Sequence, residues 1–127
     1  EFLVKRSFEA DRLHLGRLSL EERQRLAVES RREIETAQGE GRYRAIDTLG
    51  LLSDRAATLE IAKIAGDPSD VTAQWLAARA LGRIADRRAV PALRRATQSP
   101  DENVRMWAYW ALVRIAGGRG AAGTSPE

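Results

Sequence analysis

Apolar residues recur three and four positions apart along most of this chain, which is the spacing of one face of an α-helix. Apolar and polar residues alternate, as in a half-buried strand, only in two short stretches, at residues 13–15 and 18–20. β-Branched residues are also sparse, which disfavours strands. The pattern therefore predicts an all-α protein.

Two helices are expected before residue 40. Ser19 followed three residues later by Glu22 is a capping box, and it predicts a helix that runs to about Gln38 and ends at the glycines 39 and 41. Upstream, residues 7–15 are predicted to form a short helix that Gly16 ends.

From residue 41 onward the chain repeats itself. The segments GRYRAIDTLGLLSD, AQWLAARALGRIAD and VRMWAYWALVRIAG begin at Gly41, Ala73 and Val104. Leu49, Leu81 and Leu112 align, with spacings of 32 and 31 residues. Shorter apolar segments with proline-containing turns lie between them, so the unit is a short helix A, a turn and a longer helix B. One such unit cannot bury its apolar stripe alone, and stacked units share a continuous core.

These repeats resemble the HEAT-repeat family, in particular its short bacterial form, the PBS-lyase-type HEAT repeat. The family pattern is approximately D-x-x-V-R-x-x-A-x-x-A-L-G-x-I-x-D-x-x-A-V-P-x-L. The matching residues are Ala77, Ala80, Leu81, Gly82, Ile84, Asp86, Ala89, Val90, Pro91 and Leu93, then Val104, Arg105, Ala108, Ala111, Leu112 and Ile115. The first repeat is degenerate, because Gly41-Arg42 and Ala73-Gln74 replace the Val-Arg pair.

The resemblance implies a right-handed α-solenoid of about two and a half HEAT-type helix pairs. We expect residues 1–40 to form helices that cap the stack, residues 41–117 to form the repeats, and residues 118–127 to be a flexible tail. The tail prediction comes from composition, since GRGAAGTSPE has too little apolar surface to offset the entropy of ordering it.

The resemblance is nearly silent on function, because the same fold serves many purposes. HEAT proteins mostly bind other proteins, while some relatives bind DNA, process bilin pigments or modify nucleobases. In such a solenoid the B helices line the concave face. The primary hypothesis is therefore a non-catalytic scaffold that binds a partner protein on that face.

A projection at 100° per residue separates the faces of the B helices. The core positions are Ala73, Ala77, Ala80, Leu81 and Ile84 in the second B helix, and Val104, Ala108, Ala111, Leu112 and Ile115 in the third. The outward positions form three rows, which are Tyr43, Trp75 and Met106, then Asp47, Arg79 and Trp110, then Leu51, Arg83 and Arg114. Gly50 and Gly82 are also projected to point away from the core.

Large apolar and arginine side chains in adjoining rows have the composition of a binding hot spot. The candidate partner-binding residues are Tyr43, Trp75, Arg79, Arg83, Met106, Tyr109, Trp110, Val113 and Arg114. Two other interpretations stay open. In the first, the C-terminal repeat is an end cap or a self-association surface. In the second, the tryptophans simply pack against neighbouring helices.

Arginines cluster between residues 79 and 95, which raises the alternative of binding to nucleic-acid phosphates. The candidate contacts for phosphate or for an acidic partner are Arg79, Arg83, Arg87 and Arg88. Against this, Asp86 is placed to form salt bridges between repeats, and Arg94 and Arg95 are expected on the solvated outer face. The group also straddles a B helix, a turn and an A helix, so its members cannot all share one surface.

Composition argues against catalysis and metal binding on this chain. There is no cysteine, and His14 is the single histidine, which removes thiolate chemistry and makes a metal site or catalytic triad improbable. We assign no catalytic residue, metal ligand or cofactor. The net charge of +3 is mild, which is weak evidence for nucleic-acid binding. No apolar run is long enough to span a bilayer, which excludes a polytopic membrane protein. The expected location is the cytoplasm. Because the sequence begins at Glu1, a non-catalytic fragment of a larger enzyme or of a membrane-anchored protein stays open.

Overall fold

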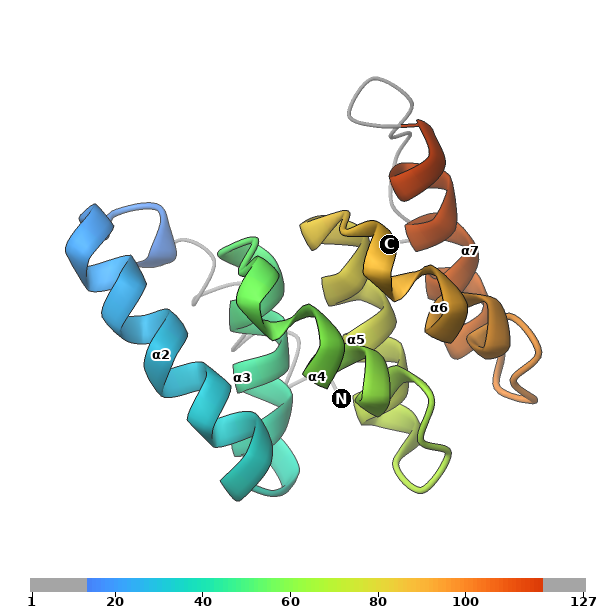
Figure 1. The fold of residues 1–127 in the computed structure, drawn as a ribbon. Helices are drawn as coiled ribbons and strands as arrows, with labels where there is room; N and C mark the ends of the chain where they lie inside the picture. The colour runs from blue at the N-terminus through green and yellow to red at the C-terminus, as the bar shows by residue number, and fades with distance from the viewer. Residues whose placement is uncertain (1–13, 118–127) are drawn as a thin grey trace.

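The computed structural model describes residues 14–117, and every regular element in that range is helical (Figure 1). The six α-helices that lie wholly in this range are α2 (Leu20–Thr36), α3 (Gly39–Leu51), α4 (Thr58–Ala65), α5 (Val71–Ile84), α6 (Val90–Ala96) and α7 (Glu102–Gly117). The 3-10 turns η1 (Arg55–Ala57) and η2 (Arg87–Ala89) precede α4 and α6. The prediction of an all-α protein is confirmed.

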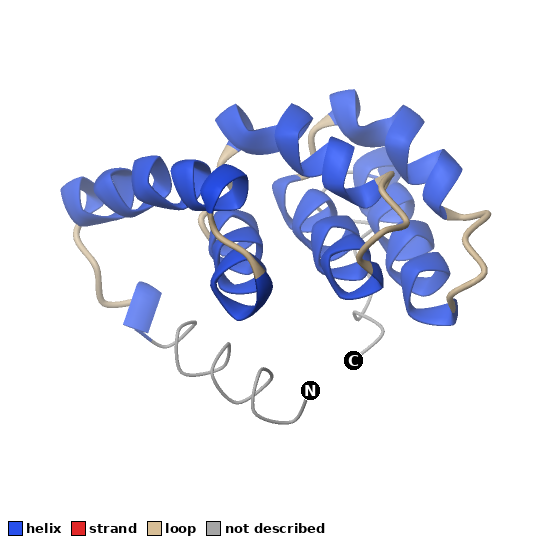
Figure 2. Ribbon diagram, turned by 90° about the horizontal axis from the view of Figure 1, so that it is seen from below, coloured by secondary structure: helices blue, strands red, loops and turns tan. Residues whose placement is uncertain are grey.

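The helices pair in chain order and form two layers (Figure 2). One layer holds α2, α4 and α6. The other holds α3, α5 and α7, which we call the B helices, with α5 packed between α3 and α7. Successive pairs stack side by side, which is the arrangement of a small α-solenoid.

The predicted capping box of the N-terminal helix is confirmed, but Gly39 and Gly41 lie in the next helix rather than ending this one. The Ser19 hydroxyl accepts a hydrogen bond from the backbone N–H of Glu22, and the Glu22 carboxylate accepts one from the N–H of Ser19. The helix ends at Thr36, and α3 begins directly at Gly39, whose φ of +59° suits glycine best. The helix predicted for residues 7–15 lies almost wholly outside the described residues, as does the tail at 118–127.

The predicted core stripes are confirmed. All five projected core residues of α5 are buried, and so are Val104, Ala108, Ala111 and Ile115 of α7, while Leu112 is partly buried. Many of these residues are alanines, so the B helices approach one another closely.

Two glycines stand at the closest approach of the B helices. A Cβ atom at Gly50 would lie 2.7 Å from Cα of Ala80, and a Cβ atom at Gly82 would lie 3.0 Å from Cα of Ala111. Both glycines are buried against the next B helix. The projection that placed Gly50 and Gly82 on an outward surface is therefore wrong, because the neighbouring helix occupies that direction.

Candidate functional site

The centre of the B-helix layer is a buried ion-pair cluster. One carboxylate oxygen of Asp47 on α3 accepts hydrogen bonds from the guanidinium groups of Arg79 and Arg83 on α5, each at 2.8 Å. The side chains are 2%, 8% and 18% exposed, respectively. The expectation that Asp47 and Arg79 point into solvent is wrong, because each points toward the adjacent B helix, where an opposite charge compensates its desolvation.

Aromatic rings complete the surroundings of Arg79. Its guanidinium carbon lies 5.2 Å from the ring centre of Trp75 and 5.3 Å from that of Trp107. The two indoles are stacked, with ring centres 6.4 Å apart and 18° between their planes. Cation–π attraction therefore adds to the ion pair, and it holds Arg79 in one position.

A second arginine–tryptophan pair joins α5 to α7. The Nε of Arg114 donates to the backbone carbonyl of Gly82 at 2.9 Å, and its guanidinium carbon lies 5.3 Å from the ring centre of Trp110. Trp110 is only partly exposed, and it meets Trp107 edge to face at 5.2 Å. Its six-membered ring occupies the space that the missing side chain of Gly82 leaves. Trp110 is thus partly a packing residue.

Tyr43 lies beside this cluster, on α3. Its hydroxyl donates to the carboxylate of Asp70, at 2.9 and 3.0 Å, and Asp70 also caps α5 by accepting from the N–H of Ala73. Burial, followed by the hydrogen bond to Asp70, raises the pKa of the Tyr43 hydroxyl. Sequence reasoning missed Asp70, although its position directly before an apolar helix is a signal for an N-cap.

The nine candidate partner-binding residues divide between two surfaces. Six of them form what we call the B-helix face, which consists of Tyr43, Trp75, Arg79, Arg83, Trp110 and Arg114. The other three are exposed along α7 at the end of the stack, and we call Met106, Tyr109 and Val113 the α7 end strip. They are 38%, 56% and 55% exposed, as expected for outward positions.

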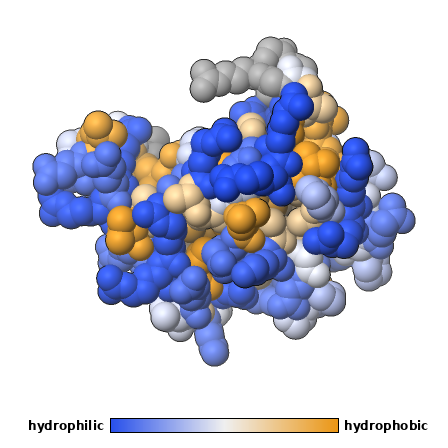
Figure 3. Space-filling view, in the orientation of Figure 1, coloured by the Kyte–Doolittle hydropathy of each residue, from blue (hydrophilic) through white to orange (hydrophobic). Residues whose placement is uncertain are grey.

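The other arginines of the cluster between residues 79 and 95 lie on the side of α2, α4 and α6, opposite the B helices. Arg87 and Arg88 lie in η2, and Arg94 and Arg95 are exposed on α6. The face that carries α4 and α6 is largely hydrophilic (Figure 3). Arg79 and Arg83 lie on α5 in the other layer, so the four candidate phosphate contacts do not form one patch.

Of the two salt bridges of Asp86, the one to Arg55 joins it to the preceding repeat, whereas the shorter one to Arg88 lies within its own turn. Its carboxylate accepts from Arg88 at 2.6 Å and from the Thr58 hydroxyl at 2.9 Å, and it lies 3.8 Å from Arg55. The hydrogen bond from the Arg88 side chain is the main reason why the pKa of Asp86 lies below its usual range. Arg88 is therefore engaged within the protein.

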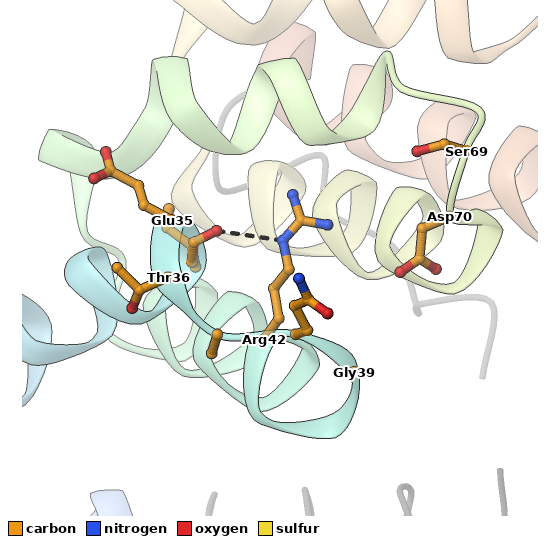
Figure 4. Close-up of a pocket in the computed structure, with 9 residues that line it drawn as sticks. Glu35, Thr36, Gly39, Arg42, Ser69 and Asp70 are labelled. Carbon is orange, nitrogen blue, oxygen red and sulfur yellow. Dashed lines mark hydrogen bonds between the residues drawn. The ribbon is translucent and has the colours of Figure 1, made fainter.

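A shallow pocket lies between the α2–α3 turn and the α4–α5 loop (Figure 4). Arg42 projects into it and donates from Nε to the carbonyl of Ile34 at 3.3 Å. Asp70 brings a carboxylate to the same pocket, and Glu35 also lines it with its carboxylate directed away from Arg42 (Figure 4), so the pocket is not suited to an anion. The lining comes from separate chain segments, which is why the sequence pattern did not reveal it.

Between residues 14 and 117, no three side chains of His, Asp or Glu come together in a way that would hold a metal ion. Over the same residues, no helix is long and apolar enough to cross a membrane.

A comparison with protein-family models finds a match. Residues 62–124 match the family model of HEAT repeats, a range that begins within α4 and includes α5, α6 and α7. No curated protein matches the chain. The match therefore includes the repeats that begin at Ala73 and Val104.

Proposed function

Because residues 62–124 of this chain belong to the HEAT repeats, we propose that the protein is a non-catalytic interaction module that binds a partner protein on its B-helix face. HEAT repeats are generally protein-binding modules. The observation that carries the proposal is the group of aromatic and arginine side chains that α3, α5 and α7 bring together around Asp47.

The chemistry of this face suits a protein contact. Tryptophan, tyrosine and arginine are the residue types most enriched at binding hot spots. Trp75, Trp110 and Tyr43 are each partly exposed, so a partner has apolar surface left to cover. The partly exposed arginines of the face, Arg83 and Arg114, offer planar groups that pair with carboxylates.

Internal contacts hold these side chains in place before any partner arrives. Trp75 is fixed by its stacking with Trp107 and by Arg79, and Trp110 is fixed by Arg114. A side chain that is already ordered loses little entropy on binding, which increases the net affinity from a given contact area. Arg79 is buried, so its role in the proposal is to position Trp75 rather than to touch the partner.

The charge of the face indicates the character of the partner. Two guanidinium groups share the single carboxylate of Asp47, and Arg114 adds a third positive group nearby. A partner segment that carries acidic residues is therefore favoured over a basic one. Phosphate binding is a weaker candidate, because Arg87 and Arg88 lie in the other helix layer.

Site-specific photo-crosslinking tests the proposal. A photoreactive amino acid at position 83 is expected to crosslink a partner protein in extracts of the source cells. The same amino acid at position 94, on the exposed face of α6, is the matched control and is expected to give no such product. Equal crosslinking at both positions would contradict a binding site on the B-helix face.

Once crosslinking has identified the partner, calorimetric titration with the free partner measures the free energy of binding. Arg83→Ala is expected to weaken binding by about 1 kcal/mol or more, whereas Arg94→Ala leaves the affinity unchanged. Wild-type affinity in Arg83→Ala would refute the role of the face. If the captured molecule is a nucleic acid and affinity falls steeply with salt, the phosphate-binding alternative replaces the proposal.

A further inference from the structure

The outer side of α4 and α6 is strongly cationic. Together with the 3-10 turns before them, these helices cover residues 55–65 and 87–96 and present nine exposed residues, of which six are cations and none is an acid. The exposed positions of α2, in the same layer, carry four acids and three arginines. The excess of positive charge therefore belongs to α4 and α6 alone within this layer. We call the six cations the basic surface, which consists of Arg55, Lys63, Arg87, Arg88, Arg94 and Arg95.

Contacts between the two helices bring these cations onto one surface, on the side that Figure 3 shows. Arg88 donates from Nη2 to the backbone carbonyl of Arg55 at 3.0 Å, which joins η2 to η1. At the other end, Nη2 of Arg95 lies 4.0 Å from the place that a Cβ atom at Gly66 would take, just after α4. The cations therefore gather at the two ends of the α4–α6 pair, with Arg55, Arg87 and Arg88 at the start and Lys63, Arg94 and Arg95 at the end.

Three members of the basic surface have no partner in the described part of the chain. Between residues 14 and 117, no hydrogen bond or ion pair involves the side chain of Arg87, Arg94 or Arg95. Glu60 is the one carboxylate within residues 55–65 and 87–96, and it pairs with Lys63 at 3.2 Å. The three arginines are therefore available to an anion from outside.

The carboxylates that adjoin these segments are engaged elsewhere. Asp86 is buried and accepts from Arg88 at 2.6 Å. Asp67 and Asp101 each accept a hydrogen bond from a backbone N–H group two or three residues further along the chain. Glu102 is exposed in the first turn of α7, where the helix dipole favours a negative charge. None of these four carboxylates lies within ion-pair distance of the three available arginines.

The composition of the surface favours the phosphate backbone of a nucleic-acid duplex over other anionic partners. Protein-binding hot spots centre on aromatic side chains, and the nine exposed residues include none. A bilayer surface is held by inserted apolar side chains as well as by charge, and Leu59 is the single large hydrophobic residue among the nine. Single strands stack their bases on aromatic rings, which are also missing. Arginine forks bind phosphate oxygens with two hydrogen bonds, and protein–DNA interfaces are polar and strongly positive.

We propose that the basic surface binds the backbone of a nucleic-acid duplex without reading its sequence. Arg87 and Arg94 are seven residues apart, which places the two ends of the surface about 10 Å apart along α6. Cations at that distance reach phosphates on both sides of a minor groove, which is about 6 Å wide. The surface lies on the layer opposite the B-helix face, so the inference does not rest on the function proposed for that face.

Fluorescence anisotropy with a labelled DNA duplex of arbitrary sequence tests the proposal at several salt concentrations. The affinity should fall with a log–log slope of about −0.9 per neutralised phosphate, hence about −3 or steeper if each of the three available arginines neutralises one. Arg94→Glu combined with Arg95→Glu should weaken binding at least about tenfold and make the slope shallower by about 2. Arg87→Glu, at the other end of the surface, should weaken binding as well.

The matched control changes the same charge on the neighbouring helix. Arg23→Glu combined with Arg32→Glu alters exposed positions of α2 and is expected to keep the wild-type slope. Circular dichroism checks that both double variants fold like the wild type. An absence of duplex binding at low salt, or equal losses in the two double variants, overturns the proposal.

Other anions distinguish the possible sources of the contact. Labelled poly-glutamate and vesicles that contain phosphatidylserine are expected to bind at least about tenfold more weakly than the duplex. Binding of poly-glutamate as tight as that of the duplex would replace the proposal by an acidic protein partner, and tighter binding of vesicles would replace it by a membrane surface. Arg83→Ala is expected to leave duplex affinity unchanged, and a loss as large as that of the Arg94 and Arg95 double variant would move the site to the B-helix face.

Discussion

Gly50 sets the distance between α3 and α5, so its replacement by alanine tests how tightly the B helices are packed. The added Cβ atom would lie 2.7 Å from Cα and 2.8 Å from Cβ of Ala80. Non-bonded carbon atoms are most stable about 3.5–4.0 Å apart. The two helices must therefore separate by about 1 Å at this point. The atoms in the way belong to backbone and Cβ, so no side chain can rotate to make room.

Two opposing effects determine the change in the free energy of unfolding. Alanine is favoured over glycine in a helix interior by about 1 kcal/mol. Overpacking of a well-packed core costs about 1–3 kcal/mol, and the rigid contact at Ala80 places Gly50→Ala near the upper end of that range. The expected net loss of stability is about 2 kcal/mol. The separation also stretches the nearby hydrogen bond between Asp47 and Arg79, which adds to the loss.

Urea unfolding, followed by circular dichroism and tryptophan fluorescence, measures this change. Gly41→Ala is the matched control in the same helix, since its Cβ atom meets only the Cβ of Ala37, at 3.6 Å. The control is expected to be as stable as the wild type or slightly more stable. If Gly50→Ala proves as stable as Gly41→Ala, the close approach of α3 and α5 is not a feature of the folded protein.

Three further predictions use the same unfolding measurement. Asp47→Ala removes the carboxylate that Arg79 and Arg83 share, and it should cost about 3 kcal/mol or more; a loss below about 1 kcal/mol would contradict a buried ion pair. Hydrogen bonds hold the pKa of Asp86 below its usual range, so its stabilisation is complete above the unfolded pKa of about 4 and is lost as the pH falls from there through the lower folded pKa. Asp86→Asn should therefore lose less stability than the wild type on acidification below about pH 4, and equal losses would refute this. Ser19→Ala removes the cap of α2 and should cost about 1 kcal/mol, whereas no loss would show that the cap is dispensable.

The fold was predictable because a repeating sequence must bury the same face in each unit. The recurrence of Leu49, Leu81 and Leu112 located the three B helices, and these leucines are fully or partly buried. The start of α2 was predictable for a different reason, since a capping box involves only residues three positions apart. The capping box is a signal within one helix, and the leucines are a signal that recurs at a fixed spacing, so neither requires knowledge of how helices pack.

The site was less predictable, because its contacts join different helices. Asp47 and Arg79 are 32 residues apart, and their hydrogen bond depends on how two B helices stand side by side. A helical projection gives only the direction of a side chain from its own axis. In a solenoid, a side chain that points away from its A helix lies either on the open surface or against the next B helix. A projection of one helix does not distinguish these two environments, and it therefore placed Arg79 in solvent.

A single position of the repeat accounts for both the buried cluster and the exposed strip. Where that position is glycine, at Gly50 and Gly82, the next B helix comes close enough to enclose Asp47 with Arg79 and to place Trp110 over α5. Where it is Val113, the same approach is blocked, and the apolar surface around it stays exposed. The glycine-to-valine change thus prevents a further B helix from packing on α7 at the distance that separates α3, α5 and α7.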